Sequence, residues 1–453
     1  MLRPTRTTMN RLSTIGWIGL GAMGHPMALN LFTKTYLAHQ QSSASDHQSG
    51  GAATGARVGV GEPRYVICEQ DEGRVDSFLT DLRNQGGSEL ASKVERLSSG
   101  KEVAQTASRI LTMLPSTPQV ESVYLDKHTG ISAGLQSLSS SDAPILGTAN
   151  PVGSSRDEAN IEQLSSTTTI SPGPDIPGTQ TPPIDSSTTL SPSSQAATSS
   201  SSQASAPLHS TGNGDIENST AHTLLIDCTT LSPTSAIQVA EAIHASTNGH
   251  AMMLDAPVSG GTVAAAQGQL TIMFGSPSDT VTQMALPLLQ TMARDGGVMY
   301  CGSNGKGVGV KVCNNLILAI NQIALAEGLA LGRSLDIDPT LLHNVINTSS
   351  GASWSSRVNS PLAEIPGSPG ERGYKGGFQS RLMLKDAGLA LQAASDLDLP
   401  IPMTWAAKSI YEAVCNEEGE DWATRDFSVV YEWIKKKQSQ GVERGWKADP
   451  TST

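Results

Sequence analysis

"IGWIGLGAMGHPMALNL", residues 15–31, sets a short aliphatic segment before the glycine pattern Gly19-x-Gly21-x-x-Gly24 and a helical pattern after it. In such a turn the first glycine permits a sharp change of direction. The second lets the backbone approach a pyrophosphate, and the third lets helix and strand pack closely. The free N–H groups at the helix start then attract the anion. Strand, turn and helix in this order predict a dinucleotide site formed by Gly19, Gly21, Ala22, Met23 and Gly24.

Short apolar runs continue to alternate with helical patterns up to residue 301. Six of these runs are bounded by turn residues and rich in aliphatic side chains: "TIGWIGLG", "RYVICE", "RILTMLP", "TLLIDCTT", "AMMLDAPV" and "TIMFG". They predict a mostly parallel sheet covered by helices, an α/β Rossmann-type domain over residues 14–301. Over residues 302–440 helical periodicity takes over, so an all-α C-terminal domain is expected there.

Two stretches of the first domain have too few large apolar residues to offset the entropy of ordering them. Residues 38–63 are small and polar, and residues 136–221 are dominated by Ser, Thr, Pro and Gly. We predict two disordered surface insertions. The second can be interpreted as an inert loop, a regulatory or docking segment, or an error in the gene model, and we favour the inert loop. Residues 1–13 and 441–453 are expected to be tails.

The overall composition argues against several classes of protein. A formal net charge of -12 disfavours nucleic-acid and membrane-surface partners. The longest apolar stretch is interrupted by Asn321, Gln322 and Glu327, so we predict no transmembrane span. The five cysteines are scattered without a C-x-x-C pair, which favours core thiols over disulfides or a metal site. The arginine-bearing, acid-free N-terminus is typical of a mitochondrial presequence, with a cytoplasmic location as the alternative.

The second predicted strand ends in an acidic residue, Glu69. In dinucleotide-binding folds an acid at this place accepts a hydrogen bond from the ribose 2′-OH. A carboxylate also repels the 2′-phosphate of NADP, so we expect NAD as the cofactor. The alternative is that Glu69 is only a solvated carboxylate at a strand end.

A single lysine stands in the nearly uncharged helical run "GVGVKVCNNLILAINQIALAEG", residues 307–328. At 100° per residue, Lys311, Asn315, Leu318 and Gln322 share one narrow stripe. Amides beside one ammonium are typical of a polar cavity inside a protein, because each buried donor must find an acceptor. The alternative is a lysine at a helix start whose head reaches the solvent. This run alone leaves both interpretations open.

Several stretches, in order along the folded part of the chain, resemble the β-hydroxyacid dehydrogenases of the 6-phosphogluconate dehydrogenase-like superfamily. They are "GWIGLGAMGHPMALNL", "ILTMLPS", "LLIDCTTLSP", "MLDAPVSGGTVAAAQGQLTIMFG", "YCGSNGKGVGVKVCNNLILAI", "SSGASWSS", "YKGGFQSRLMLKDAGLA" and "DFSVVYEWI". The combination of "DAPVSGG" with G-x-K-x-x-N-N is specific to the family. "SWSS", and "GGF" ahead of "LMLKD", indicate the 3-hydroxyisobutyrate branch.

The resemblance implies a role at each matching position. Lys311 matches the catalytic lysine, and Asn315 matches its substrate-orienting partner. Contacts with the cofactor are implied for Leu114, Pro115, Thr230 and Lys385. Contacts with the substrate are implied for Ser259, Gly260 and Gly261, at its carboxylate, and for Trp354 and Phe378, around its methyl-bearing carbon. A free lysine is a poor base at neutral pH, so burial or a nearby cation such as Lys385 would have to lower its pKa.

The resemblance implies NAD-dependent oxidation of 3-hydroxyisobutyrate to methylmalonate semialdehyde, a step of valine breakdown, by a homo-oligomer. Alternatives in the same class are reductases of glyoxylate, tartronate semialdehyde or succinate semialdehyde. 6-Phosphogluconate dehydrogenase would need a basic phosphate pocket and a longer helical domain, neither of which is evident. A catalytically silent NAD-binding scaffold is a further alternative, which cofactor binding without turnover would support.

Overall fold

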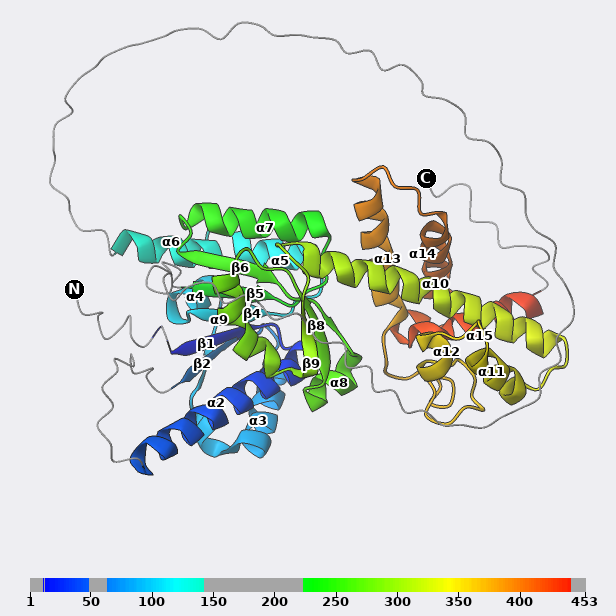
Figure 1. Ribbon diagram of the computed structural model, residues 1–453, viewed down its shortest axis with the longest axis horizontal. Helices are drawn as coiled ribbons and strands as arrows, with labels where there is room; N and C mark the ends of the chain where they lie inside the picture. Colours follow the sequence, from blue (N-terminus) through cyan, green and yellow to red (C-terminus); the bar gives the residue numbers. More distant parts are fainter. Residues whose placement is uncertain (1–10, 12, 49–62, 142–222, 441–453) are drawn as a thin grey trace, which may run out of the picture. The chain divides into compact units, whose positions relative to one another are not determined.

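The structure, a computed structural model, describes residues 11, 13–48, 63–141 and 223–440, and these belong to one compact unit. The expected tails, apart from Arg11 and Ser13, lie outside the described residues. So do residues 49–62 and 142–222, which make up most of the two expected insertions. Figure 1 shows the helices and strands with their labels.

Six parallel strands form the main sheet in the order β3-β2-β1-β4-β5-β6. They are β1 (Thr14–Ile18), β2 (Arg64–Cys68), β3 (Val94–Leu97), β4 (Arg109–Thr112), β5 (Thr223–Asp227) and β6 (Ala251–Asp255). The order reverses between β1 and β4, and dinucleotides bind outside the carboxyl ends of the strands at such a switch point. The turn after β1 lies at this place.

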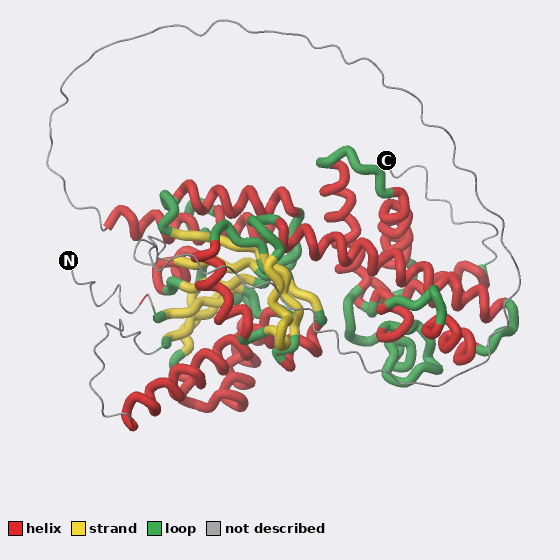
Figure 2. Tube along the Cα trace, viewed as in Figure 1, coloured by secondary structure: helices red, strands yellow, loops and turns green. Residues whose placement is uncertain are grey.

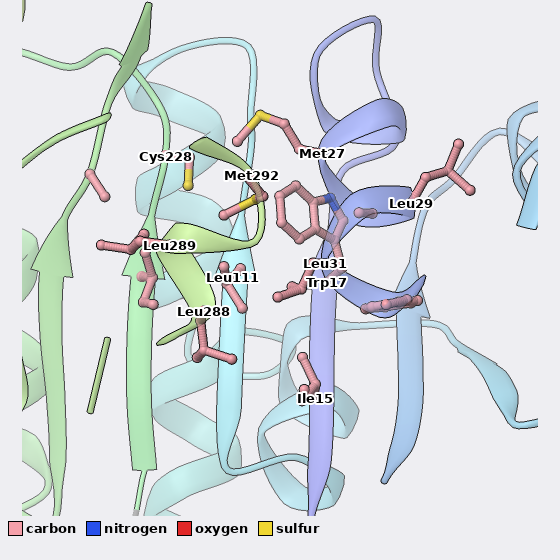
Figure 3. Close-up of a cluster of buried hydrophobic side chains, with 14 of the residues drawn as sticks. Ile15, Trp17, Met27, Leu29, Leu31, Leu111, Cys228, Leu288, Leu289 and Met292 are labelled. Carbon is pink, nitrogen blue, oxygen red and sulfur yellow. The ribbon is translucent and has the colours of Figure 1, made fainter. Parts of the chain in front are cut away.

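Helices cover both faces of this sheet, as Figures 1 and 2 show. Their bounds are α2 (Gly24–Gln48), α3 (Glu72–Ser92), α4 (Gly100–Thr106), α5 (Thr117–Leu125), α6 (Ile131–Ser141), α7 (Pro233–Ser246), α8 (Gly261–Gln267) and α9 (Asp279–Gln290). One apolar core contains side chains of α2, α3 and α9, and a second contains side chains of α4, α5, α6 and α7. Figure 3 shows Trp17, which is fully buried, in the first core with Leu31 and Leu111.

A smaller second sheet follows, formed by β7 (Val258–Ser259), β8 (Leu270–Phe274) and β9 (Ala293–Tyr300). β7 pairs with β8 in antiparallel fashion, and β8 pairs with β9 in parallel fashion. The run "TIMFG" is therefore a strand, as expected, but of this sheet and not of the main one. The sequence analysis did not predict β3, β7 or β9.

The C-terminal part of the chain is helical. It contains α10 (Lys306–Ser334), α11 (Pro339–Thr348), α12 (Trp354–Val358), α13 (Ser380–Ser395), α14 (Pro402–Cys415), α15 (Val430–Ser439) and the 3-10 helices η2 (Trp422–Thr424) and η3 (Phe427–Val429). Side chains of α10, α13, α14 and α15 share one apolar core. A Rossmann-type domain followed by an all-α region confirms the predicted fold class.

Among the described helices, α10 is long and apolar enough to cross a membrane. Its apolar composition has another explanation in this fold, because α10 packs against α13, α14 and α15 and against β8. Its buried positions also include Lys311, Asn315 and Gln322, three polar side chains that lipid would not solvate.

Two expected boundaries need correction. The first insertion was expected to begin at residue 38, but α2 continues to Gln48. Residues 37–48 contain Ala and Gln and lack Gly and Pro, so nothing in this segment stops the helix. The second insertion was expected from residue 136, but α6 continues to Ser141. Leu135 of this helix is buried in the second apolar core, which stabilises its last turns.

Candidate active site

The glycine-rich turn has the geometry that a pyrophosphate site requires. Gly19 has φ +94°, and a Cβ there would lie 2.4 Å from the carbonyl oxygen of Met113. A Cβ on Gly24 would lie 2.0 Å from the carbonyl oxygen of Gly19. At Gly21, by contrast, a Cβ would meet no atom within 4 Å. The turn is therefore closely packed on its protein side and open at Gly21, directly before the N–H groups at the start of α2.

Glu69 lies beside this turn and stabilises it through hydrogen bonds to backbone N–H groups. One carboxylate oxygen accepts a hydrogen bond from the Leu20 backbone N–H at 2.7 Å. The other accepts from the N–H groups of Gln70 and Asp71, at 2.9 and 3.1 Å. Glu69 is thus more than a solvated carboxylate at a strand end. Its contact with a ribose hydroxyl stays a prediction. The carboxylate oxygen that accepts only the Leu20 hydrogen bond keeps a lone pair that could accept from such a hydroxyl.

Buried hydrogen bonds connect the ends of β4 and β5, where the resemblance places Leu114, Pro115 and Thr230. The Leu114 N–H donates to the Thr229 hydroxyl at 2.9 Å. Asp227 accepts hydrogen bonds from the Thr112 hydroxyl at 2.7 Å and from the Thr229 N–H at 3.2 Å. Burial raises the pKa of the Asp227 carboxyl to about 6. These bonds fix the positions of the two segments expected to lie along the cofactor.

The three residues expected at the substrate carboxylate lie at the start of α8. Gly260 has φ +135° and Gly261 has φ +70°, in the region that favours glycine. A Cβ on Gly260 would also lie 2.7 Å from that of Ala264. Ser259 is the last residue of β7. The turn thus needs both glycines for its backbone shape, whatever ligand it binds.

Lys311 and Asn315 are buried on α10, with 8% and 2% of their surface exposed. The Asn315 side-chain NH₂ donates to Asp386 of α13 at 2.5 Å. Lys385 lies 3.3 Å from the other Asp386 oxygen and donates to the Thr230 carbonyl at 3.1 Å. Lys311, Asn315, Lys385 and Thr230, which are far apart in the sequence, therefore belong to one polar cluster.

Burial lowers the pKa of Lys311, and the charge of Lys385 lowers it further, while Asp386 opposes both effects. This is the direction that a general base needs, because a lysine of ordinary pKa is protonated at neutral pH. Lys311, Asn315 and Gln322 of the expected polar stripe are buried, and Leu318 of the same stripe is half-buried. Gln322 does not join the lysine cluster, since its amide exchanges hydrogen bonds with Asn359.

Trp354 and Phe378 are not joined to this cluster by any contact described in the structure. Trp354 is 52% exposed at the start of α12. Phe378 packs against Phe427, with ring centroids 5.9 Å apart. Sequence analysis also missed Asp386, although it adjoins the expected Lys385. The signal was available, since a carboxylate on a helix of apolar periodicity needs a buried partner.

The residues present fit a dinucleotide cofactor. The open backbone at Gly21 and the helix start of α2 lie at the switch point of the sheet, where such cofactors bind. Within the described ranges, no group of three or more His, Cys, Asp or Glu is arranged to hold a metal ion. A dinucleotide fold with a buried lysine in a polar cluster is the arrangement expected of nicotinamide-dependent dehydrogenases.

Two family models match the chain. Residues 199–303 match the NAD binding domain of 6-phosphogluconate dehydrogenase. Residues 305–434 match the model described as the NAD-binding domain of NADP-dependent 3-hydroxyisobutyrate dehydrogenase. Both descriptions specify NAD binding, which confirms the expected cofactor. The second also names an NADP-dependent enzyme, so the preference for NAD over NADP that Glu69 indicates stays a prediction.

Similar proteins narrow the class. A probable mitochondrial 3-hydroxyisobutyrate dehydrogenase of Arabidopsis thaliana is 45% identical over 181 residues, 40% of this chain and 50% of that protein. The mitochondrial 3-hydroxyisobutyrate dehydrogenase of Mus musculus is 36% identical over 232 residues, 51% of this chain and 67% of that protein. An NAD-dependent L-serine dehydrogenase of Pseudomonas aeruginosa is 39% identical over 220 residues, 48% of this chain and 70% of that protein. The chain belongs to the 3-hydroxyisobutyrate dehydrogenase family, and the matched segments span half to about two thirds of the length of these relatives.

A solved structure has the same fold. The 3-hydroxyisobutyrate dehydrogenase of Mycobacterium tuberculosis, determined with L-serine, superposes with a TM-score of 0.59 and 24% identity. The superposition covers 93% of this chain and 99% of the other. The shared architecture therefore includes both the sheet domain and the helical region.

Proposed function

We propose that the protein oxidises 3-hydroxyisobutyrate to methylmalonate semialdehyde with NAD, with Lys311 as the general base. The observation that carries the proposal is the burial of Lys311, with a lowered pKa, in a cluster with Asn315, Lys385 and Asp386. A silent scaffold would have no need to maintain a buried lysine, because desolvating an ammonium costs stability.

Each part of the proposed reaction falls to a separate group of residues. The turn at Ser259, Gly260 and Gly261 holds the substrate carboxylate through its hydroxyl and N–H groups. Asn315, fixed by Asp386, orients the substrate hydroxyl toward Lys311. Lys311 accepts the hydroxyl proton as the carbon loses a hydride. NAD, when bound, supplies the acceptor for that hydride.

L-Serine is the alternative substrate that the similar proteins bring forward. It has the same carboxylate and the same hydroxymethyl group as 3-hydroxyisobutyrate, but an ammonium replaces the methyl group. The carboxylate turn and the lysine base would serve both molecules equally well. Specificity must then come from the residues around the central carbon, where Trp354 and Phe378 would favour the methyl group.

Steady-state NADH formation by the full chain, with 3-hydroxyisobutyrate, L-serine, glycerate and 4-hydroxybutyrate, tests this proposal. We expect kcat/KM for 3-hydroxyisobutyrate to exceed that for L-serine by about 10-fold or more. The reason is that the ammonium group of L-serine would lose its water in the pocket without gaining an ionic partner. A reversed preference would assign the serine reaction. Activity with glycerate or 4-hydroxybutyrate alone would support one of the semialdehyde reductases. Activity with none of the four hydroxyacids, alongside normal NAD binding, would support the scaffold alternative.

The same assay compares NAD with NADP. Glu69 supports the preference for NAD, because its carboxylate lies at the turn where a 2′-phosphate would bring two further charges. We expect kcat/KM to be higher with NAD, and we expect Glu69→Gln to narrow the difference. A preference for NADP in the wild type would contradict this part of the proposal.

We also propose a location in the mitochondrial matrix and a homo-oligomeric state. Relatives named as mitochondrial support the first, although bacterial relatives also occur. Exposed apolar side chains of the helical region support the second, with Leu397, Leu399, Met403 and Trp405 more than half exposed. Sedimentation of the purified chain would measure the oligomeric state directly.

A further inference from the structure

Two buried aspartates end adjacent strands of the main sheet. Asp227 is the last residue of β5 and Asp255 the last residue of β6, and they are paired in the strand register. Their exposed fractions are 1% and 3%. No ion pair with Lys or Arg is described for either residue within the resolved ranges, so backbone and hydroxyl donors solvate both carboxylates. Burying two carboxylates without a cationic partner lowers the stability of the fold. The two aspartates contact different segments of the site, which indicates a separate function for each.

The Asp227 carboxylate serves the cofactor side. It accepts hydrogen bonds from Thr112 at the end of β4 and from the N–H of Thr229. The Thr229 hydroxyl in turn accepts from the Leu114 N–H. Tyr124, which is fully buried, exchanges a hydrogen bond with Thr112 at 2.9 Å and completes the network.

The Asp255 carboxylate serves the catalytic helix. One oxygen accepts from the Gly305 N–H at 2.7 Å, and the other accepts from the Val308 N–H at 2.9 Å. Both donors lie at the start of α10, whose free N–H groups and positive dipole end stabilise a carboxylate. Lys311 follows Val308 by three residues, and Ser259 follows Asp255 by four.

Glycines leave space for the Asp255 carboxylate. A Cβ on Gly275 would lie 2.8 Å from one of its oxygens, and a Cβ on Gly307 would lie 2.8 Å from the other. The start of α10 thus approaches the ends of β6 and β8 more closely than any side chain would permit. Asp255 connects the base-bearing helix to the strand that leads into the carboxylate turn.

We propose that the two aspartates are positioning residues with separate tasks: Asp227 positions the cofactor-binding segments, and Asp255 positions Lys311 relative to the substrate turn. The second task rests on the proposed function, whereas the first needs only NAD binding. Neither residue touches the reacting atoms, so each acts through the segments it holds.

Asp227→Asn and Asp255→Asn, each in the full chain, separate the two tasks. NAD affinity is measured by calorimetry, kcat at saturating NAD by NADH formation, and the mobility of residues 303–311 by amide hydrogen exchange. For Asp227→Asn we expect a Kd for NAD raised about 10-fold, with kcat within about 3-fold of wild type. For Asp255→Asn we expect an unchanged Kd for NAD, kcat lowered by about 30-fold, and faster exchange at residues 305–308.

A merely structural role would give the two variants the same pattern, with affinity, kcat and exchange all altered together, and this result would overturn the proposal. If either variant fails to fold, milder changes address the same contacts. Thr229→Val removes the acceptor of the Leu114 N–H, and Asp255→Ser removes the charge at the start of α10 while keeping one oxygen acceptor there. Calorimetry and amide exchange need no substrate, so they remain decisive even if the wild type proves inactive with every hydroxyacid and the proposed function fails.

Discussion

Lys311 lies near one side chain that raises its pKa, Asp386, and one that lowers it, Lys385. Both belong to α13 and are adjacent in the sequence, so two single substitutions can change the same base in opposite directions. Burial is the larger influence on Lys311 and stays the same in both variants. The pH dependence of the oxidation therefore measures the electrostatics of this one residue.

Oxidation needs Lys311 neutral, so kcat should fall as the pH decreases through its pKa in the loaded enzyme. Asp386→Asn removes the charge that raises this pKa, and we expect the acid limb of kcat to move to lower pH. An amide oxygen can still accept the hydrogen bond of Asn315, which limits the change in geometry. Lys385→Gln, at saturating NAD, should move the limb to higher pH. Shifts in the same direction for both variants would contradict the assignment of Lys311 as the base.

At the scale of elements, the strands that sequence analysis predicted are those with aliphatic runs. β3 was not predicted because it is short and half of its residues, "VERL", are charged. It is an edge strand of the sheet, where charged side chains reach the solvent. β9 contains Arg294, Asp295 and a pair of glycines, and it becomes a strand only by pairing with β8. Local composition predicts strands that bury both faces, and it misses strands that tertiary pairing creates.

The glycine-rich turn makes two opposite predictions for similar substitutions. A methyl group at Gly21 meets no protein atom, so Gly21→Ala should leave the free energy of unfolding within about 0.5 kcal/mol of wild type. It would still project where the pyrophosphate approaches, and the Kd for NAD should rise by about 10-fold or more. Gly24→Ala collides with the Gly19 carbonyl and should cost about 1–3 kcal/mol of stability.

Thermal unfolding and calorimetric NAD binding measure these two effects separately. A destabilised Gly21→Ala with normal NAD affinity would show that the turn is a packing device and not a cofactor site. A Gly24→Ala variant as stable as wild type would contradict the close packing of turn and helix.

The chain between α6 and β5 is attached at the amino end of the parallel strands. Thr223 begins β5, while the glycine-rich turn follows the carboxyl end of β1. Residues 49–62 likewise lead into the first residue of β2. Both segments therefore join the sheet at the amino ends of its strands, whereas the cofactor-binding turn lies at the carboxyl ends.

We expect replacement of residues 144–217 by a Gly/Ser linker of roughly ten residues to preserve the enzyme. The NAD affinity and kcat should stay within about 2-fold of wild type, since no active-site segment begins there. Parallel assays of the shortened and full-length chains provide the measurement. A large loss of activity in a folded, NAD-binding variant would assign this segment a part in regulation or docking.

At the scale of the whole molecule, the site depends on contacts that local sequence patterns cannot predict. Asn315 and Asp386 are 71 residues apart, and Lys385 reaches Thr230 across 155 residues. Helical periodicity had placed Lys311 and Asn315 on one stripe, but only the family resemblance brought Lys385 and Thr230 to them before the structure did. The positions of Trp354 and Phe378 relative to the substrate stay predictions.

Asp227 and Asp255 were within reach of the sequence argument. Each is a single acid that ends a predicted aliphatic strand, in "TLLIDCTT" and in "AMMLDAPV", just as Glu69 ends "RYVICE". The argument applied to Glu69 was not extended to them, because no ligand contact is expected at their places and most of their partners are backbone N–H groups. Hydrogen bonds of that kind leave no mark on the composition of a sequence.

The central claim is that Lys311 is the base of a hydroxyacid dehydrogenase, and Lys311→Ala tests it most directly. NADH formation from 3-hydroxyisobutyrate should fall by about 100-fold or more, while the Kd for NAD, measured on the same sample, stays within about 2-fold of wild type. A variant that binds NAD and keeps most of the wild-type kcat at every pH would contradict the claim.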